Sequence, residues 1–263
     1  MGNKAIQELM VTLPLDSRFP VNGIIKEVAA RTETSLHQHD WNQLVFSDTG
    51  VVQVTTPNGM YWVPPQNAVW IPSCHTHSAV LLERAKLFSV YFLPTPALLD
   101  TVEWHQCQCF EVSALLGELL KKMATTALEA IPESIYQALC QLIYAEIEQS
   151  ELISMAVPMP SDKRLLHLCQ LFLRTPRQSV KLYDLAAVVG ASESTIRRLF
   201  KAELNMTFSQ WRQQALLACA ITLSANKMPI GRIALELGYS SHSAFTAMVT
   251  SVAGRSPKLF FDQ

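Results

Sequence analysis

Hydrophobic positions follow two different periods along this 263-residue chain. Between Val21 and Leu93, short runs rich in β-branched and aromatic residues alternate with Pro, Gly, Asn and Asp. Such runs predict β-strands, and Pro57-Asn58-Gly59 predicts a tight hairpin turn between two of them. The runs are residues 24–28, 43–46, 51–55, 60–63, 68–71, 79–82 and 86–93. Seven or eight close-set strands predict an antiparallel sandwich or a small barrel.

A helical period replaces the strand pattern from Glu111 to Ser150. Leucines and other apolar residues recur there at steps of three and four, first over 115–123 and then over 139–147. This spacing predicts two amphipathic helices, and Pro132 is well suited to open the second one. Their apolar faces can close the barrel or pair with a second subunit, and the residues favour neither role. A linker is expected next at residues 158–162, where two prolines interrupt any helix, with Ser161 or Asp162 capping a helix over 163–174.

The stretch from 179 to 260 carries one pattern twice. Ala186 and Gly190 recur 48 positions later as Ala234 and Gly238, each pair at the end of a short apolar-periodic helix. A small residue lets two helices approach closely, and Gly allows the positive φ that ends a helix. The serine that follows each Gly, Ser192 or Ser240, is expected to cap the next helix. A single copy fits an ordinary helical hairpin equally well, but two in tandem favour paired helix-turn-helix motifs.

These segments resemble a known family. The stretches LYDLAAVVGASESTIRRLFKAELNMTFSQWRQQ and IGRIALELGYSSHSAF, with the closing Gly254-Arg255-Ser256-Pro257-x-x-Phe260, are similar to the DNA-binding domain of AraC/XylS-type transcriptional regulators. The resemblance covers about 80 residues and implies a domain over 163–263 that binds double-stranded promoter DNA. It also implies that the helical segment, residues 111–157, forms a homodimer interface.

Charge is distributed unevenly between the two halves. Residues 1–161 hold 8 Lys/Arg and 16 Asp/Glu, a net of −8, whereas residues 162–263 hold 13 Lys/Arg and 6 Asp/Glu, a net of +7. The two sum to the overall −1. A basic C-terminal half behind an acidic N-terminal half favours one domain that meets a polyanion and one that does not, although chance clustering is the alternative.

Two helices are expected to read DNA. In the first, about 193–204, apolar residues form the core stripe and leave polar and basic side chains for the major groove, where Arg can bind guanine through two hydrogen bonds. The candidates there are Ser192, Ser194, Thr195, Arg197, Arg198 and Lys201. A connecting helix, about 207–224, leads to the second reader, about 241–252. Its candidates are Ser241, His242, Ser243 and Thr246.

The second reader helix departs from the family pattern because it contains no Lys or Arg. Leu216 also stands where the family usually has Arg in the connecting helix. Fewer cations displace fewer counterions, which predicts weak binding by this helix and a dominant first reader.

A histidine constellation lies in the strand-rich half. His37 and His39 are two residues apart, so they point to the same side of an extended chain. Together with Gln43 and His77 they resemble the two cupin motifs, whose residues converge in the mouth of a barrel. Three departures stand out: Gln43 replaces a Glu, Cys74 replaces a turn Gly, and Leu81 replaces an Asn. A divalent metal at His37, His39 and His77, a polar lining for an organic effector, and ordinary structural histidines all remain open.

The remaining features restrict the class of protein. Six scattered cysteines lack zinc-ribbon spacing, and the first twelve residues lack the shape of a signal peptide, which favours a cytoplasmic protein. No apolar run approaches the length of a membrane span. Nine glycines form no phosphate-binding loop, and no nucleophile–base pair is visible, so no enzymatic activity is expected.

The sequence therefore predicts an α+β protein with a cupin-like sensor barrel over 1–110, followed by the helical segment, the linker and a double helix-turn-helix domain over 163–263. The predicted function is a DNA-binding transcription regulator that responds to a small molecule or metal. The alternatives are a metal-dependent cupin enzyme tethered to a DNA-binding domain, and a DNA-binding protein whose N-terminal domain only dimerises.

Overall fold

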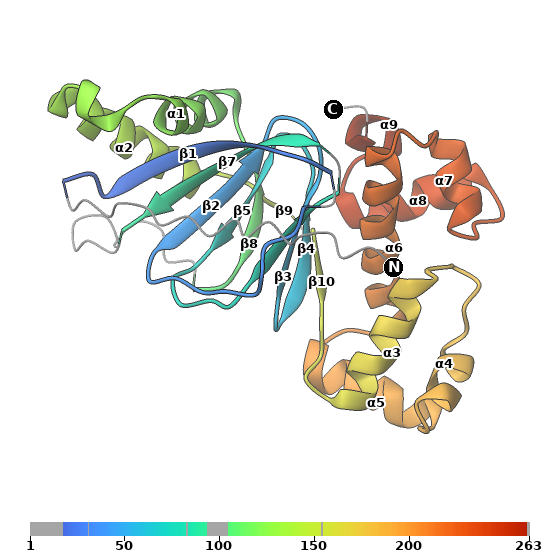
Figure 1. Ribbon diagram of the computed structural model, residues 1–263. Coiled ribbons are helices and arrows are strands. Elements are labelled where there is room, and N and C mark those ends of the chain that lie inside the picture. Colours follow the sequence, from blue (N-terminus) through green and yellow to red (C-terminus); the bar gives the residue numbers. More distant parts are fainter. Residues whose placement is uncertain (1–17, 31, 83, 94–104, 154, 262–263) are drawn as a thin grey trace, which may run out of the picture. The chain divides into compact units, whose positions relative to one another are not determined.

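The structure is a computed structural model that describes residues 18–30, 32–82, 84–93, 105–153 and 155–261. It has the α+β character expected from the two hydrophobic periods, with strands in the first half of the chain and helices in the second (Figure 1). The chain divides into two compact units. The first comprises Met1–Thr55 and Val63–Ile153, and the second comprises Thr56–Trp62 and Ser154–Gln263.

The first unit contains a six-stranded sheet in which every neighbouring pair is antiparallel. Its order is β1-β7-β2-β5-β8-β9. The strands are β1 (Val21–Val28), β2 (Asn42–Ser47), β5 (Asn67–Ile71), β7 (Ala85–Phe92), β8 (Gln108–Glu111) and β9 (Leu152–Ile153). In the same unit β3 (Val52–Thr56) pairs with β6 (Ser78–Leu81), also antiparallel. The predicted antiparallel β domain is therefore confirmed.

Two helices cover one face of the six-stranded sheet. They are α1 (Ala114–Thr125) and α2 (Glu133–Glu148), joined by the short 3-10 helix η1 (Leu128–Ala130). The buried stripes of both helices share one core with the sheet residues Trp70, Phe92 and Phe110. Gly23 in β1 permits the close approach of α1, because a Cβ there would lie 2.7 Å from the backbone nitrogen of Ala124. The apolar faces of this segment therefore close the core, which is one of the two roles that the sequence leaves open.

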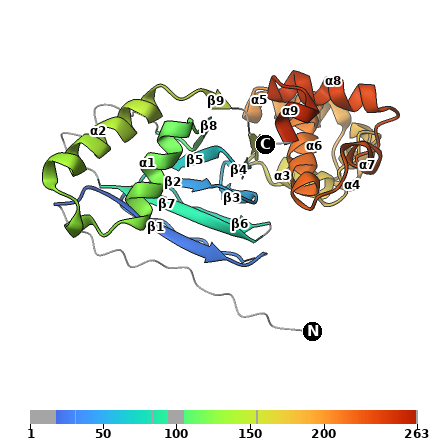
Figure 2. The ribbon, with the colours of Figure 1, turned by 90° about the horizontal axis from the view of Figure 1, so that it is seen from above.

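The second unit contains seven helices among the described residues. They are α3 (Lys163–Arg174), α4 (Leu182–Val188), α5 (Glu193–Leu204), α6 (Phe208–Ala225), α7 (Ile230–Glu236), α8 (His242–Ala253) and α9 (Pro257–Phe261). The expected bounds of α3 and α5 are confirmed, and those of α6 and α8 differ by one residue. Figure 1 shows α3, α4 and α5 around one end of α6 and α7, α8 and α9 around the other, whereas the two groups overlap in the view of Figure 2. We call these groups the first and second lobes.

Each lobe has an aromatic or apolar centre. In the first lobe, Phe172 of α3 and Phe200 of α5 pack against Phe208 and Trp211 at the start of α6, with ring centroids 5.6–6.1 Å apart. In the second lobe Phe245 of α8 is fully buried. No helix of the described segments combines the length and hydropathy needed to cross a membrane.

A short β-ribbon also belongs to the second unit. Residues of β4 (Gly59–Val63) pair antiparallel with β10 (Ala156–Pro158), so the first residue of the expected linker lies in a strand. Two indole groups join this ribbon to the connecting helix. Trp62 Nε1 donates to Thr222 Oγ1 at 3.2 Å, and Trp211 Nε1 donates to the Pro158 carbonyl at 2.8 Å.

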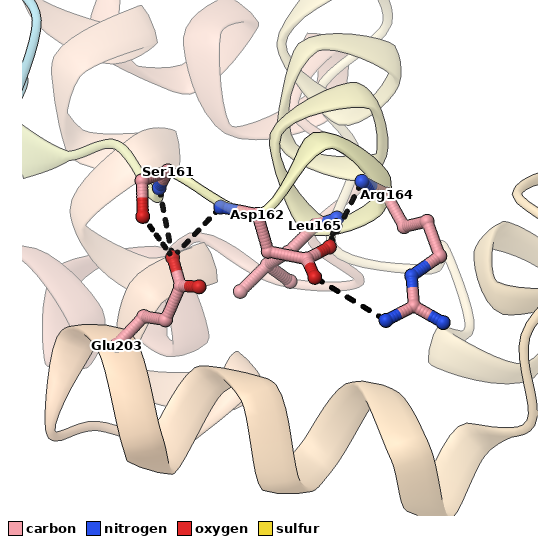
Figure 3. Close-up of polar contacts among 5 residues, drawn as sticks. All are labelled: Ser161, Asp162, Arg164, Leu165 and Glu203. Carbon is pink, nitrogen blue, oxygen red and sulfur yellow. Dashed lines mark hydrogen bonds and ion pairs between the residues drawn. The ribbon is translucent and has the colours of Figure 1, made fainter.

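The last two residues of the linker, Ser161 and Asp162, are bound to the end of α5 (Figure 3). One carboxylate oxygen of Glu203 accepts hydrogen bonds from the backbone nitrogens of Ser161 and Asp162, at 2.8 and 3.0 Å, and from the Ser161 hydroxyl at 3.2 Å. Asp162 in turn caps α3 by accepting from the nitrogens of Arg164 and Leu165. Of the two predicted caps, Ser161 and Asp162, the structure has Asp162.

Candidate DNA-binding surface and effector pocket

Both helix-turn-helix motifs turn through the same backbone geometry. Gly190 and Gly238 have φ of 67° and 77°, in the left-handed region that favours Gly. In the first motif the nitrogen of the residue after Gly190 donates to the carbonyl of Ala186 at 3.0 Å. In the second, the nitrogen after Gly238 donates to the carbonyl of Ala234 at 2.9 Å. Both alanines are buried, as the sequence predicts. The repeated pattern therefore encodes a repeated turn.

The cap of the second motif differs from the prediction. Ser192 caps α5 by accepting from the nitrogen of Thr195 at 3.2 Å, as expected. The cap of α8 is Ser241, which accepts from the nitrogen of Ala244 at 3.1 Å, and the prediction of Ser240 was wrong. The second turn is one residue longer because Tyr239 is buried there against Phe245, with ring centroids 5.4 Å apart.

Helix α5 presents its basic side chains to solvent. Ser194, Arg197, Arg198 and Lys201 are exposed, while Thr195 is half-buried beside the Ser192 hydroxyl. Arg197 forms an ion pair with Glu193 one turn earlier, its Nε donating at 2.9 Å. Lys201 donates to the side-chain oxygen of Asn205 at 2.9 Å, and among the described residues Arg198 has no ion pair.

Helix α8 presents polar but uncharged groups. Ser241, His242 and Ser243 are exposed, and Thr246 is half-buried with its hydroxyl 3.4 Å from His242 Nδ1. The two candidate reader helices therefore share a position within equivalent motifs but differ in charge. Only α5 carries Lys and Arg side chains that can replace counterions on a phosphate backbone.

The connecting helix contains a basic group that the sequence analysis did not single out. Leu216 is fully buried, whereas Arg212, one helical turn earlier, is half-buried. The Arg212 guanidinium lies 5.3 Å from the centre of the Phe208 ring. Its Nη1 donates to the carbonyls of Gln178 and Val180 at 3.1 and 3.0 Å. The available sequence signal was its position four residues after Phe208, which places both side chains on the same face of a helix.

In the first unit the structure brings the predicted histidines together. One nitrogen from each of His37, His39 and His77 lies within 4.8 Å of the others. The strand partners produce this convergence, since His37 and His77 form an antiparallel bridge with mutual backbone hydrogen bonds of 2.8 and 2.9 Å. The cluster opens into a cavity of about 150 Å³. The cavity is lined by Ile24, Lys26, Thr34, His37, Gln38, His39, Trp41, Gln43, Val45, Ile71, His77, Ala79, Leu87, Ser89 and Tyr91.

Each of the three rings is oriented by its Nδ1 atom. His37, His39 and His77 have Nδ1 at 2.7–2.8 Å from the backbone carbonyls of Ser35, Trp41 and His75 respectively. A carbonyl can only accept, so Nδ1 carries the proton and Nε2 holds the lone pair in a neutral ring. Burial lowers the pKa of His39, and burial lowers the pKa of His77 to about 4. Neutral, oriented imidazoles are the form that binds metals.

Gln43 adds an oxygen to the same cluster. Its Oε1 atom lies 2.9 Å from Nε2 of His39, and its Nε2 atom donates to Ser89 Oγ at 3.3 Å. A lone pair on His39 that faces a carbonyl oxygen is unfavourable. The contact becomes favourable when the amide turns so that its NH₂ group donates, or when a cation binds both atoms. The donor set of three imidazoles and one amide oxygen thus fits a borderline divalent ion.

Cys74 and the tryptophans near the histidine cluster have different roles in the structure. Cys74 adopts φ of 59°, which explains why a turn of this kind favours Gly. Trp41 lines the cavity and stacks on His39 with an interplanar angle of 3°. Trp62 and Trp70 do not line the cavity, because Trp62 belongs to the second unit and Trp70 lies in the core of the first.

Related proteins agree with the geometry of the second unit. Residues 185–263 match the family described as "Helix-turn-helix domain". The chain is 28% identical over 222 residues to the HTH-type transcriptional regulator NimR of Escherichia coli, which covers 84% of this chain and 80% of that protein. It is 23% identical over 237 residues to the HTH-type transcriptional activator RhaR of Mannheimia succiniciproducens, covering 81% and 82%.

A third relative and one solved structure extend this set. The arabinose operon regulatory protein of Escherichia coli is 25% identical over 118 residues, covering 43% of this chain and 40% of that protein. The structure of ToxT from Vibrio cholerae aligns with a TM-score of 0.39 and 11% identity, covering 92% of this chain and 98% of that one. Over residues 185–263 the chain is therefore similar to a helix-turn-helix domain, and the two relatives that share most of its length are named as transcriptional regulators.

Proposed function

We propose that this protein is a sequence-specific, DNA-binding transcription regulator whose N-terminal cavity binds an effector. The observation that carries the proposal is the pair of helix-turn-helix motifs with matching turns, one of which presents Ser194, Arg197 and Arg198 to solvent. Helices in this position enter the major groove, where such side chains bind base edges and phosphates. Relatives named as transcriptional regulators support the same function.

Binding to double-stranded DNA is the first test. A random-sequence duplex library is incubated with the full chain at low salt, and retained sequences are selected over several rounds. We expect enrichment of a sequence with two recognition elements about one helical turn apart, roughly 34 Å, because α6 places a motif at each of its ends. Absence of any enriched sequence, together with no binding to duplex DNA at low salt, would refute the proposed function.

The effector site is the cavity around the histidine cluster. We propose that His37, His39 and His77 hold a divalent metal ion there, with Gln43 close enough to join them. When bound, such an ion supplies a Lewis-acidic centre to which an oxygen or nitrogen atom of an organic effector can bind. The remaining wall of Trp41, Tyr91 and aliphatic side chains offers an apolar surface of the kind that small organic ligands need.

Metal content can be tested independently of DNA binding. The full chain is treated with chelator, loaded with Zn²⁺ or Ni²⁺, desalted and analysed by elemental mass spectrometry. We expect one ion per chain, and its loss in His77→Ala. His75→Ala is the matched control, because this neighbouring imidazole lies outside the cluster. Equal metal content in the two variants would exclude the cluster as the metal site, while the DNA-binding function would stand.

We also propose a homodimer formed through the outer faces of α1 and α2. Their inner faces are committed to the core, yet Leu115, Ile135 and Leu142 remain 49%, 52% and 46% exposed. Sedimentation velocity of the full chain tests this idea. We expect a dimer that Leu142→Glu weakens, and a wild-type protein that stays monomeric at micromolar concentration would refute it.

A further inference from the structure

Arg212 of α6 holds a loop of the first lobe that also contacts the second lobe. Its two hydrogen bonds, from Nη1 to the carbonyls of Gln178 and Val180, hold the loop between α3 and α4. The same loop contacts the turn of the second motif, since the Gln178 nitrogen donates to the Leu237 carbonyl at 2.8 Å. A Cβ on Gly238 would lie 3.5 Å from that nitrogen, so the two backbones are in close contact. One loop of the first lobe therefore touches the reading motif of the second.

The surroundings of Arg212 make it a costly group to bury for stability alone. Its Nε atom is buried and has no hydrogen-bond partner among the described residues, and the same is true of the hydroxyl of Tyr239 beside the second turn. Burial raises the pKa of Tyr239 to about 12, and the positive charge of Arg212 opposes that rise. Replacing buried charges by apolar groups is often neutral or stabilising, so a half-buried arginine with a buried Nε atom points to a role in fixing the geometry of its neighbours.

We propose that Arg212 is a positioning residue for DNA recognition, which holds the α3–α4 loop against the second turn and thereby fixes the separation of the two reader helices. The inference rests on the proposed DNA-binding function. Two readers on a rigid frame accept only one spacing of their recognition elements, whereas a looser frame accepts several. Arg212 would then contribute to the selection of DNA without touching it.

The physical basis is the geometry of the guanidinium group. One planar fork with several donors can bind two carbonyls while its aliphatic stem packs on Phe208. Removing the group releases the loop from α6 but leaves the apolar contacts of both lobe cores intact. The expected change is therefore in the relative order of the lobes rather than in the folding of either one.

The test uses the duplex selected by the wild-type chain and a series in which one or two base pairs are inserted between its two recognition elements. Each inserted pair rotates the second element by about one tenth of a helical turn. We expect the wild-type affinity to fall at least five-fold per insertion. For Arg212→Met, which keeps an unbranched apolar stem, we expect a fall below two-fold. Arg212→Lys should be intermediate, because it retains charge and donors on a shorter reach.

Two further measurements separate positioning from damage to the fold. A duplex with the first recognition element alone should bind wild type and Arg212→Met with affinities within about two-fold, because each lobe remains folded. Tyr239→Phe is the matched control, since it removes a hydroxyl without a described partner and should keep the wild-type spacing dependence. The proposal is overturned if Arg212→Met and Arg212→Lys both retain the wild-type spacing dependence, or if both lose binding to the single element. Failure of the wild type to bind any duplex would instead refute the proposed function.

Discussion

Replacing Arg198 by alanine should weaken DNA binding more than any single replacement in α8. Helix α5 carries three outward cations, Arg197, Arg198 and Lys201, whereas α8 carries none. Arg197 is already paired with Glu193, and Lys201 is bound to a neighbouring side chain. Arg198 is exposed without an ion pair in the described part of the chain. It can therefore bind DNA without first breaking an ion pair.

The expected magnitude depends on which part of DNA Arg198 contacts. A contact to a base edge is worth about 1–3 kcal/mol, roughly a 5-fold to 150-fold change in affinity, and its loss relaxes specificity at that base. A contact to phosphate lowers affinity for all sequences and reduces the slope of log K against log salt by about 0.9. His242→Ala should change the slope little, because this replacement removes no Lys or Arg side chain that could replace counterions.

Fluorescence anisotropy with the selected duplex measures both quantities at several salt concentrations. Arg197→Ala is the matched control, since it removes the same group one position away but from an existing ion pair. We expect the losses of affinity to rank Arg198→Ala first and His242→Ala last. A larger loss for His242→Ala than for Arg198→Ala would show that the assignment of the dominant reader to α5 is wrong.

Three other predictions concern the fold. Gly190→Ala should destabilise the protein by about 1 kcal/mol, because Gly190 has a positive φ. Gly231→Ala in α7 should stabilise it by about the same amount, because alanine favours the helix and neither glycine has a neighbour within 4 Å that a Cβ would meet. Urea denaturation measures both changes. Cys74 is exposed and should react with Ellman's reagent within minutes, whereas Cys109, whose thiol pKa is raised by burial, should react only after unfolding; equal rates would contradict the burial. Trp211→Phe should cost about 2–4 kcal/mol, from lost volume and an unpaired β10 carbonyl, and a smaller shift in thermal unfolding would count against that hydrogen bond.

Local signals explain how much of the second unit was predictable. Glycine with positive φ, a serine cap and an apolar stripe lie within a few residues of one another, and they fix α5 and α8 to within one residue. The one error, the cap at Ser240, arose because the repeat length of 48 was carried past a buried Tyr239. The repeat length does not reveal an extra residue in a turn, whereas the packing of Tyr239 in the structure does.

Long-range contacts explain what was not predictable. The convergence of His37 with His77 followed from a family resemblance, and the spacing along the chain could not supply the strand pairing that creates it. The pairing of β4 with β10 joins residues about a hundred positions apart, and nothing in the proline-containing linker signals a strand. Arg212 was missed for the same reason, because its partners lie in a loop more than thirty residues away.

The β4–β10 ribbon has a consequence for exchanging parts between related regulators. A chimaera joined just before β10 would receive α6 without the indole of Trp62 and β10 without its partner strand β4. An uncovered strand edge invites pairing with other chains. A chimaera that is to keep the C-terminal half functional must therefore also contain residues 56–62. The unit that can be exchanged between proteins is discontinuous in sequence.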